Sequence, residues 1–322
     1  MVKKINSKTI IKIFPIIGII LLAYIIYNIG AEKITTTFIS IPIEYYVLAL
    51  LLFIPRILLY VYQWQLICKK QKMDFSFLYL FKVSIICLFY GSVTPGSLGW
   101  HLRIYYLKEK TKYTWEKCIA NSLLDGTIGS ISGIFLALIG SLILIEYVPG
   151  LFTILLLLLI FYVVTFVVLM KKKRGNRLFN IFIRLLIPEK FKGIIGQSIE
   201  SLYEDLPRLR DVVVPFLLEI IIWILAAIQV YVIALAFSID VPFVSFISIS
   251  IVSAVVATSL PISVGGLGIR EGMFVFLLSA FGVEPQIAFV ISLSGYLVKT
   301  LLPGFVGWFF TFRKTEEMMR VN

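Results

Sequence analysis

Nine apolar runs follow one another along the chain, separated by short polar segments. Most are long enough to cross a bilayer, whose hydrocarbon core takes roughly 20 helical residues. Each is expected to be helical, because backbone groups in lipid must find their partners within the segment. The runs cover residues 10–30, 43–66, 75–93, 119–145, 150–170, 212–237, 241–262, 269–283 and 286–311. We predict an all-α polytopic membrane protein of about eight transmembrane helices, with 1–322 as a single integral membrane domain.

The composition supports this class of protein. Of the 322 residues, 60% are hydrophobic and only 15% are charged, and the net charge is +12. In a soluble protein such a surplus would suggest nucleic acid, but in a membrane protein it indicates cytoplasmic loops. We therefore predict a cell-membrane location and no nucleic-acid partner. Three cysteines and one histidine show no metal-ligand spacing, so we expect neither a metal nor a cofactor.

The basic residues do not fit nine simple crossings. Positively charged loops of membrane proteins collect on the cytoplasmic side. Lys69–Lys72 and Arg103–Lys117 are both basic, yet a full crossing by 75–93 would place them on opposite sides. We therefore predict that 75–93 enters the membrane, breaks at Thr94–Gly96 and returns through 97–107 as a re-entrant hairpin. This topology keeps both termini and every basic segment cytoplasmic.

Two further segments are less determined. Residues 243–283 either cross the membrane twice or form a second hairpin from the outside, and charge parity does not separate these options. The run 269–283 is short for a crossing, which favours the hairpin. The polar segment 171–211 has helical periodicity, and we predict that it forms helices lying on the cytoplasmic membrane surface.

Two glycine-proline breaks interrupt the apolar sequence. The first reads Ser92-Val-Thr-Pro-Gly-Ser-Leu-Gly-Trp-His-Leu-Arg103, and the second reads Pro261-Ile-Ser-Val-Gly-Gly-Leu-Gly-Ile-Arg-Glu271. Proline removes a backbone donor, and glycine permits unusual dihedral angles. Broken helices at membrane depth line a wet cavity or are buried in protein. Paired breaks in two halves of a chain indicate a transport site between inverted repeats, whereas simple kinking for packing is the alternative.

Both breaks favour an anionic ligand. Each precedes a helix start, whose free N–H groups and positive dipole end attract an anion. Each also carries an arginine, and guanidinium groups suit phosphate geometry. The glycine spacing matches neither a dinucleotide-binding fingerprint nor a P-loop, and we predict no catalytic residues. The candidate substrate-binding residues are Pro95, Gly96, Gly99, Arg103, Pro261, Gly265, Gly266, Gly268, Arg270 and Glu271.

Further charges stand inside the apolar runs. Such residues are costly in lipid and mark pathways or ion pairs. Asp125 or Glu219 could balance Arg56 or Lys299, and the sequence does not assign the pairs. Lys82 is a further intramembrane charge. Tryptophans are typical interfacial anchors, a role that we expect for Trp64, Trp100 and Trp308.

The two breaks also resemble the motif regions of the lysylphosphatidylglycerol synthase transmembrane family. The similarity is carried by Thr94-Pro-Gly-Ser-Leu-Gly with Arg103, and by Leu260-Pro-Ile-Ser-Val-Gly-Gly-Leu-Gly-Ile-Arg-Glu271. It extends over residues 10 to 311. Members of this family are flippase-like membrane proteins, some of them fused to a soluble aminoacyl-transferase domain. The resemblance implies the translocating part without that domain.

These features together predict a flippase-like transporter for an anionic phospholipid or a polyprenyl-phosphate-type lipid. The headgroup would lie between the breaks, while the acyl chains stay in the bilayer. A membrane-embedded transferase for lipid-linked substrates is a second hypothesis, although the sequence has no DxD, HxxxxD or HExxH motif. A third is a non-catalytic membrane partner of a separate lipid- or glycan-modifying enzyme. A homo-oligomer is possible under each hypothesis.

Overall fold

The computed structural model describes residues 7–110, 113–169, 208–259 and 263–319, and the regular elements in these ranges are all helices. The predicted surface helices of 171–211 lie outside the described residues up to position 207. Residues 209–211 prove to be the first turn of a long apolar helix, α11 (Leu209–Ala234). The all-α membrane architecture expected from the apolar runs is confirmed.

Five stretches of helix are long and apolar enough to cross a membrane. They are α3 (Ile43–Lys70), α6 (Trp115–Ile143), α7 (Pro149–Leu169), α11, and the series of α14 (Pro285–Tyr296), a π-helical turn (Leu297–Leu301) and α15 (Leu302–Met319). A sixth candidate is α1 (Ser7–Ile29) with α2 (Ala31–Ile39), which are bent by 86° at Gly30. The expected number of about eight transmembrane helices is larger because it counted hairpin arms as crossings. These arms are too short to cross and end within the bundle.

The predicted hairpin at the first break is confirmed. Its entering arm is α4 (Phe77–Val93), and after the break the chain continues through a 3-10 turn (Leu98–Leu102) into α5 (Arg103–Lys110). The backbone N–H of Asp74 donates to the Tyr113 hydroxyl at 3.0 Å, and the rings of Phe75 and Tyr113 lie 6.0 Å apart. The chain therefore leaves the membrane at the end of the bundle where it entered.

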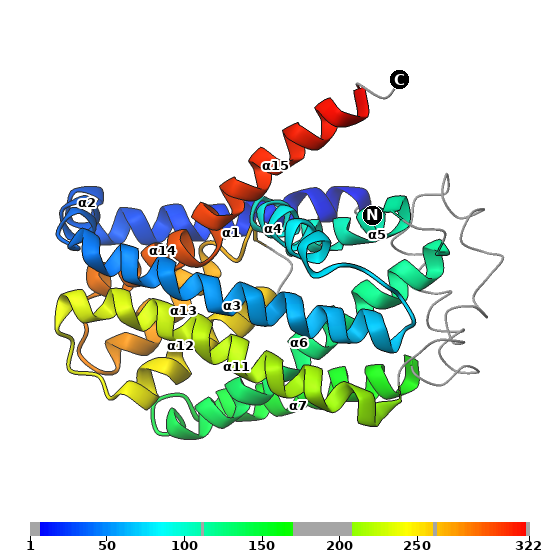
Figure 1. Cartoon of the computed structure of the whole chain (residues 1–322). Coiled ribbons are helices and arrows are strands. Elements are labelled where there is room, and N and C mark those ends of the chain that lie inside the picture. The colour runs from blue at the N-terminus through cyan, green and yellow to red at the C-terminus, as the bar shows by residue number, and fades with distance from the viewer. Residues whose placement is uncertain (1–6, 111–112, 170–207, 260–262, 320–322) are drawn as a thin grey trace, which may run out of the picture.

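The open choice for 243–283 is resolved as a second hairpin. Its arms are α12 (Phe243–Ser259) and α13 (Ile269–Ser279). Val241 before the first arm and Val283 after the second belong to one apolar cluster with Leu144, at the turn between α6 and α7. This hairpin enters from the end opposite to the first one, as Figure 1 shows.

The tips of the two hairpins meet inside the bundle. Pro95 and Val264 form an antiparallel bridge, in which the Gly96 N–H donates to the Ser263 carbonyl at 3.2 Å. Gly265 makes this approach possible, because it has a φ of +57° and a Cβ there would lie 2.6 Å from the Ser92 carbonyl oxygen. Two hairpins of opposite direction suit an inverted arrangement, although full inverted repeats stay a prediction.

Charges differ between the two ends of the bundle. The end that carries the α3–α4 and α5–α6 connections holds Lys69, Lys70, Lys72, Lys108 and Lys110, and we call it the basic end. At the opposite end the connections 144–149, 238–242 and 280–284 contain three carboxylates and no lysine or arginine. The positive-inside rule therefore predicts that the basic end is cytoplasmic.

Cysteine labelling tests this topology. The native cysteines are buried, which keeps the background low. Single cysteines at the exposed positions Lys69 and Lys110 should react with an impermeant maleimide only from the cytoplasmic side. Cysteines at the exposed positions Glu146 and Glu284 should react only from the outside. Labelling of positions 69 and 110 from opposite sides would be incompatible with the first hairpin.

Candidate functional site

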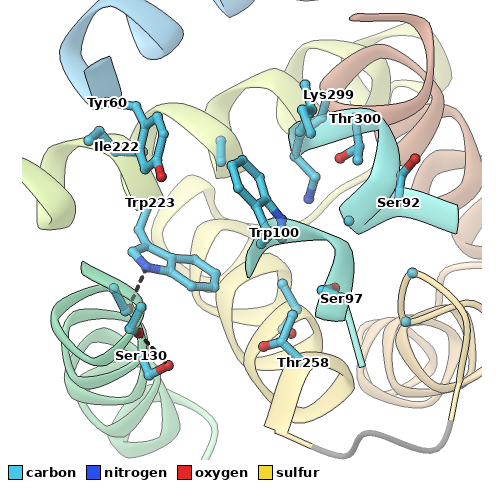
Figure 2. A pocket seen from close by; sticks show the side chains of 18 of the residues that line it. Tyr60, Ser92, Ser97, Trp100, Ser130, Ile222, Trp223, Thr258, Lys299 and Thr300 are labelled. Carbon is cyan, nitrogen blue, oxygen red and sulfur yellow. Dashed lines mark hydrogen bonds between the residues drawn. The ribbon is translucent and has the colours of Figure 1, made fainter. Parts of the chain in front are cut away.

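A cavity of about 440 Å³ lies where the two hairpin tips meet. Figure 2 shows that it is bounded by side chains from both breaks and from the surrounding helices, among them Trp100, Trp223 and Lys299. The fold brings nine of the predicted residues into its lining: Arg56, Gly96, Arg103, Asp125, Glu219, Gly265, Gly266, Arg270 and Lys299. The site predicted from two separate breaks and four isolated charges is thus one chamber.

Four predicted residues support the chamber without lining it. Pro95 forms the bridge between the tips, and Gly99 packs on the Tyr90 backbone, where a Cβ would lie 2.1 Å away. Gly268 packs equally closely on α1, and Glu271 holds Arg270. Pro261, the remaining candidate, lies outside the described residues.

One backbone N–H at each of the two helix starts is already bonded to a side chain of the same break. Glu271 accepts the Gly268 N–H at 2.7 Å, and the Thr94 hydroxyl accepts the Gly99 N–H at 2.7 Å. Each break therefore satisfies an N–H group with its own side chain. These two N–H groups are therefore not free to contact an anion.

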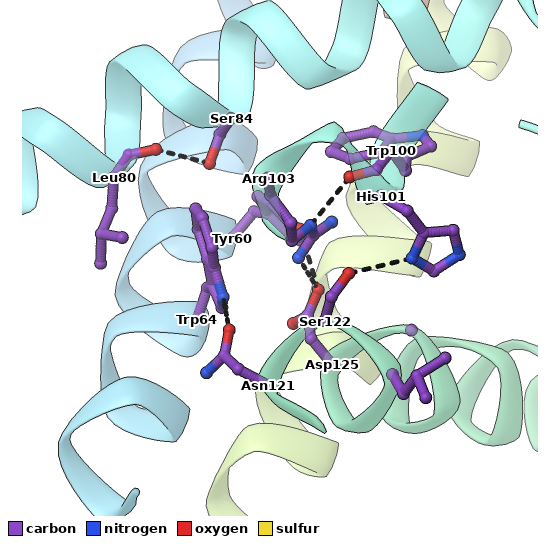
Figure 3. Close-up of polar contacts among 12 residues, drawn as sticks. Tyr60, Trp64, Leu80, Ser84, Trp100, His101, Arg103, Asn121, Ser122 and Asp125 are labelled. Atoms are coloured by element: carbon purple, nitrogen blue, oxygen red, sulfur yellow. Dashed lines mark hydrogen bonds and ion pairs between the residues drawn. The ribbon is translucent and has the colours of Figure 1, made fainter. Parts of the chain in front are cut away.

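Arg103 is held by a buried ion pair. Its guanidinium contacts the Asp125 carboxylate, and both side chains are almost completely buried (Figure 3). Tyr60 donates to the same carboxylate at 3.0 Å, and the Arg103 guanidinium lies 4.8 Å from the centre of the Trp64 ring. Buried charges are stable only when they are paired and hydrogen-bonded. Here Asp125 Oδ2 receives both contacts, while its Oδ1 is buried without a hydrogen-bond partner among the described residues. Asp125 thus balances Arg103, a pair that was not among the open possibilities of Asp125 with Arg56 or Lys299.

Arg270 is neutralised in a similar way. Its guanidinium donates to the adjacent Glu271 carboxylate at 2.5 Å and lies 4.3 Å from the centre of the Tyr296 ring. The Tyr296 hydroxyl donates to the Ser92 carbonyl at 2.9 Å. Tyr296 therefore contacts the first break through its hydroxyl and the second through its ring.

Arg56 is held by backbone instead of a carboxylate. Pro303 has no N–H, so the Lys299 carbonyl loses its i+4 helical donor. The Arg56 guanidinium donates to that carbonyl at 2.5 Å. This contact anchors Arg56 beside the π-helical turn and leaves its positive charge in place.

Two charged side chains in the chamber have no hydrogen bond or ion pair to any residue that the structure describes: Lys299 and Glu219. Figure 2 shows the Lys299 ammonium directed toward the interior near Trp100. Of the charged lining residues, four are cationic and two are acidic. After the pairing of Arg103 and of Arg270, Arg56 and Lys299 are cations without a carboxylate partner, while Glu219 is a carboxylate without a cation.

Aromatic side chains are the part of the chamber that the sequence analysis assigned wrongly or missed. Trp64 and Trp100 are not interfacial anchors: Trp64 is 1% exposed and donates to Asn121 at 2.8 Å, while Trp100 lines the chamber. Trp223 donates to the Gly129 carbonyl at 3.1 Å and packs on Gly133. In the sequence, Gly129 and Gly133 follow Asp125 at intervals of four residues. Small residues at this spacing indicate that another helix packs closely there.

Gly268 gives a sharp test of how the second break is held. A Cβ there would lie 2.1 Å from the Gly18 carbonyl oxygen, and its φ is +84°. Gly268→Ala should therefore lower the midpoint of thermal unfolding by several degrees, since the clash is with backbone. Gly150→Ala is the matched control, because open space surrounds that position. Equal midpoints for both variants would argue against the packing of α1 on the break.

Comparison with known proteins supports a membrane-protein family. The model of the lysylphosphatidylglycerol synthase TM region matches residues 10–307, a range that includes both breaks. A UPF0104 membrane protein of Methanothermobacter thermautotrophicus is 20% identical over 295 residues, covering 86% of this chain and 87% of the relative. Another, of Methanocaldococcus jannaschii, is 23% identical over 323 residues, covering 95% and 94%. The chain belongs to the lysylphosphatidylglycerol synthase TM region family.

Proposed function

We propose that this protein is a flippase-like transporter, and not an enzyme, that moves an anionic phospholipid or lipid-linked phosphate across the cell membrane. The observation that carries the proposal is the pair Arg56 and Lys299. Both line the chamber between the hairpin tips, and neither forms an ion pair with a described carboxylate. Because Glu219 is the only unpaired carboxylate among the described lining residues, one positive charge is left in surplus. A phosphate group there would supply the missing negative charge.

The position of the chamber also supports transport. Hairpins from opposite ends bound it, so a headgroup inside it is separated from each side of the membrane by one hairpin tip. Transporters place their substrates in this way, between broken helices near the middle of the bilayer. Movement of the hairpins against the rest of the bundle would open the chamber to one side at a time.

The transferase hypothesis has one observation in its favour. His101 and Ser122 both line the chamber, and the His101 Nδ1 lies 2.9 Å from the Ser122 Oγ, which is the spacing of a base and a nucleophile. Asp125 is on the same helix as Ser122, but Arg103 and Tyr60 engage it. Asp125 is therefore not free to orient His101 as a catalytic base, and we propose that His101 only holds the first break against α6 through Ser122. A chemically altered lipid that disappears with Ser122→Ala would favour the transferase.

Reconstitution tests the proposed function. The purified protein in liposomes should speed the transbilayer movement of fluorescent phosphatidylglycerol and phosphatidic acid over protein-free vesicles. Phosphatidylcholine with the same label should move more slowly, because its positive choline group meets the cations of the chamber. If no labelled lipid moved faster than in protein-free vesicles, transport would be refuted.

A further inference from the structure

A second, wholly apolar groove lies on the outside of the bundle beside the chamber. Its volume is about 490 Å³. Its walls come from α3, α4 and α15, and every residue in it is apolar: Leu50, Phe53, Phe81, Ile85, Leu302, Pro303, Val306 and Phe310. Nothing in the proposed function so far requires this groove.

The groove adjoins the chamber. Phe53 on α3 lines both spaces. On the other wall, Lys299 and Thr300 face the chamber, while Leu302 and Pro303 face the groove. The boundary between the polar and the apolar space therefore runs beside the unbalanced cations.

The inner side of the groove is closed by tightly packed helices, and its outer side is exposed. The backbones of α15 and α4 pack so closely that a Cβ at Gly307 would lie 2.1 Å from the Ile85 carbonyl oxygen. Val306 and Leu302, at the rim, are 54% and 39% exposed. The groove thus opens at the lipid-contacting surface, and its inner boundary at Phe53 is shared with the chamber that holds Arg56 and Lys299.

We propose that this groove binds the hydrocarbon chain of the same lipid whose phosphate group binds in the chamber. The inference rests on the proposed function and extends it, since the protein itself, and not bulk bilayer, would hold part of the chain. An apolar groove beside a chamber with two cations matches a molecule with an alkyl chain attached to a phosphate. A soluble phosphate compound would leave the groove without an occupant.

Binding of two probes to the full chain in amphipol tests the inference by calorimetry. Glycerol phosphate carries the headgroup alone, and dihexanoyl phosphatidic acid adds two short chains. The wild type should bind the lipid at least about tenfold more tightly than glycerol phosphate, because buried methylene groups add affinity. Val306→Trp and Leu50→Trp fill the groove from opposite walls. Each should bring the lipid to within about threefold of glycerol phosphate and leave glycerol phosphate binding unchanged.

Val164→Trp is the matched control, because Val164 is also 54% exposed and lies on α7, away from both spaces. It should bind both probes as the wild type does. If glycerol phosphate binds but the chains add nothing, or if the groove variants behave like the control, the groove inference is overturned and the headgroup site stands. If neither probe binds the wild type, the proposed function fails together with the inference.

Discussion

Replacing Lys299 with glutamine should slow the movement of anionic lipids in liposomes by about tenfold or more. The Lys299 side chain lines the chamber, and it forms no ion pair with any carboxylate in the part of the chain that the structure describes. Its charge is therefore available to a phosphate group, and hydrogen bonds between charged groups are strong. Dithionite quenching of labelled phosphatidylglycerol measures the rate.

Lys82→Gln is the matched control for this experiment. Lys82 also stands within an apolar helix, but it is exposed on the surface of α4 and does not line the chamber. Its replacement should leave the rate within about twofold of the wild type, because a lysine near the lipid surface can extend its ammonium group to water. Equal slowing by both substitutions would point to a general effect of intramembrane charge and against a site at Lys299.

Asp125→Asn should destabilise the folded protein by about 3–5 kcal/mol, the usual cost of breaking a buried ion pair from one side. The substitution leaves the Arg103 guanidinium buried without its counter-charge, and only one amide oxygen remains to accept from both Arg103 and the Tyr60 hydroxyl. The midpoint of thermal unfolding in detergent should fall, and lipid movement should be lost with it. Circular dichroism and the liposome assay provide the two readouts.

A double variant separates charge imbalance from simple loss of packing. Arg103→Met with Asp125→Leu removes both charges and keeps most of the buried volume, and such replacements are often neutral for stability. It should therefore unfold at a higher temperature than Asp125→Asn. A double variant less stable than the single one would contradict the account of Arg103 and Asp125 as a paired charge.

The sequence was sufficient to predict the architecture for physical reasons. Lipid forces apolar runs into helices, and basic loops stay on one side, so the basic segments on both sides of 75–93 revealed a hairpin. The glycines and prolines marked the tips correctly, because these residue types favour such breaks, although Ser97 also adopts a positive φ at the first tip. The same reasoning left 243–283 open, since no basic residue stands beside that segment.

The pairing of charges could not be predicted in this way. Asp125 and Arg103 are 22 residues apart, on different helices, and their contact depends on where the returning arm of the hairpin lies. Glu271 accepts the Gly268 N–H at the helix start, and this contact holds its carboxylate beside the Arg270 guanidinium. Both groups are thereby occupied and are not free for a ligand. Trp100 lies in the chamber because Gly91 gives its ring space, and hydropathy does not report such a fit.

The central claim is that an anionic headgroup passes through the chamber beside Lys299, and a ratio of rates tests it most directly. Liposomes with the wild type and with Lys299→Glu are compared for the rate of phosphatidylglycerol movement divided by that of phosphatidylcholine. This ratio does not depend on how much protein is active. We predict that the ratio exceeds one in the wild type and falls by about tenfold or more in the variant. An unchanged ratio would contradict the account.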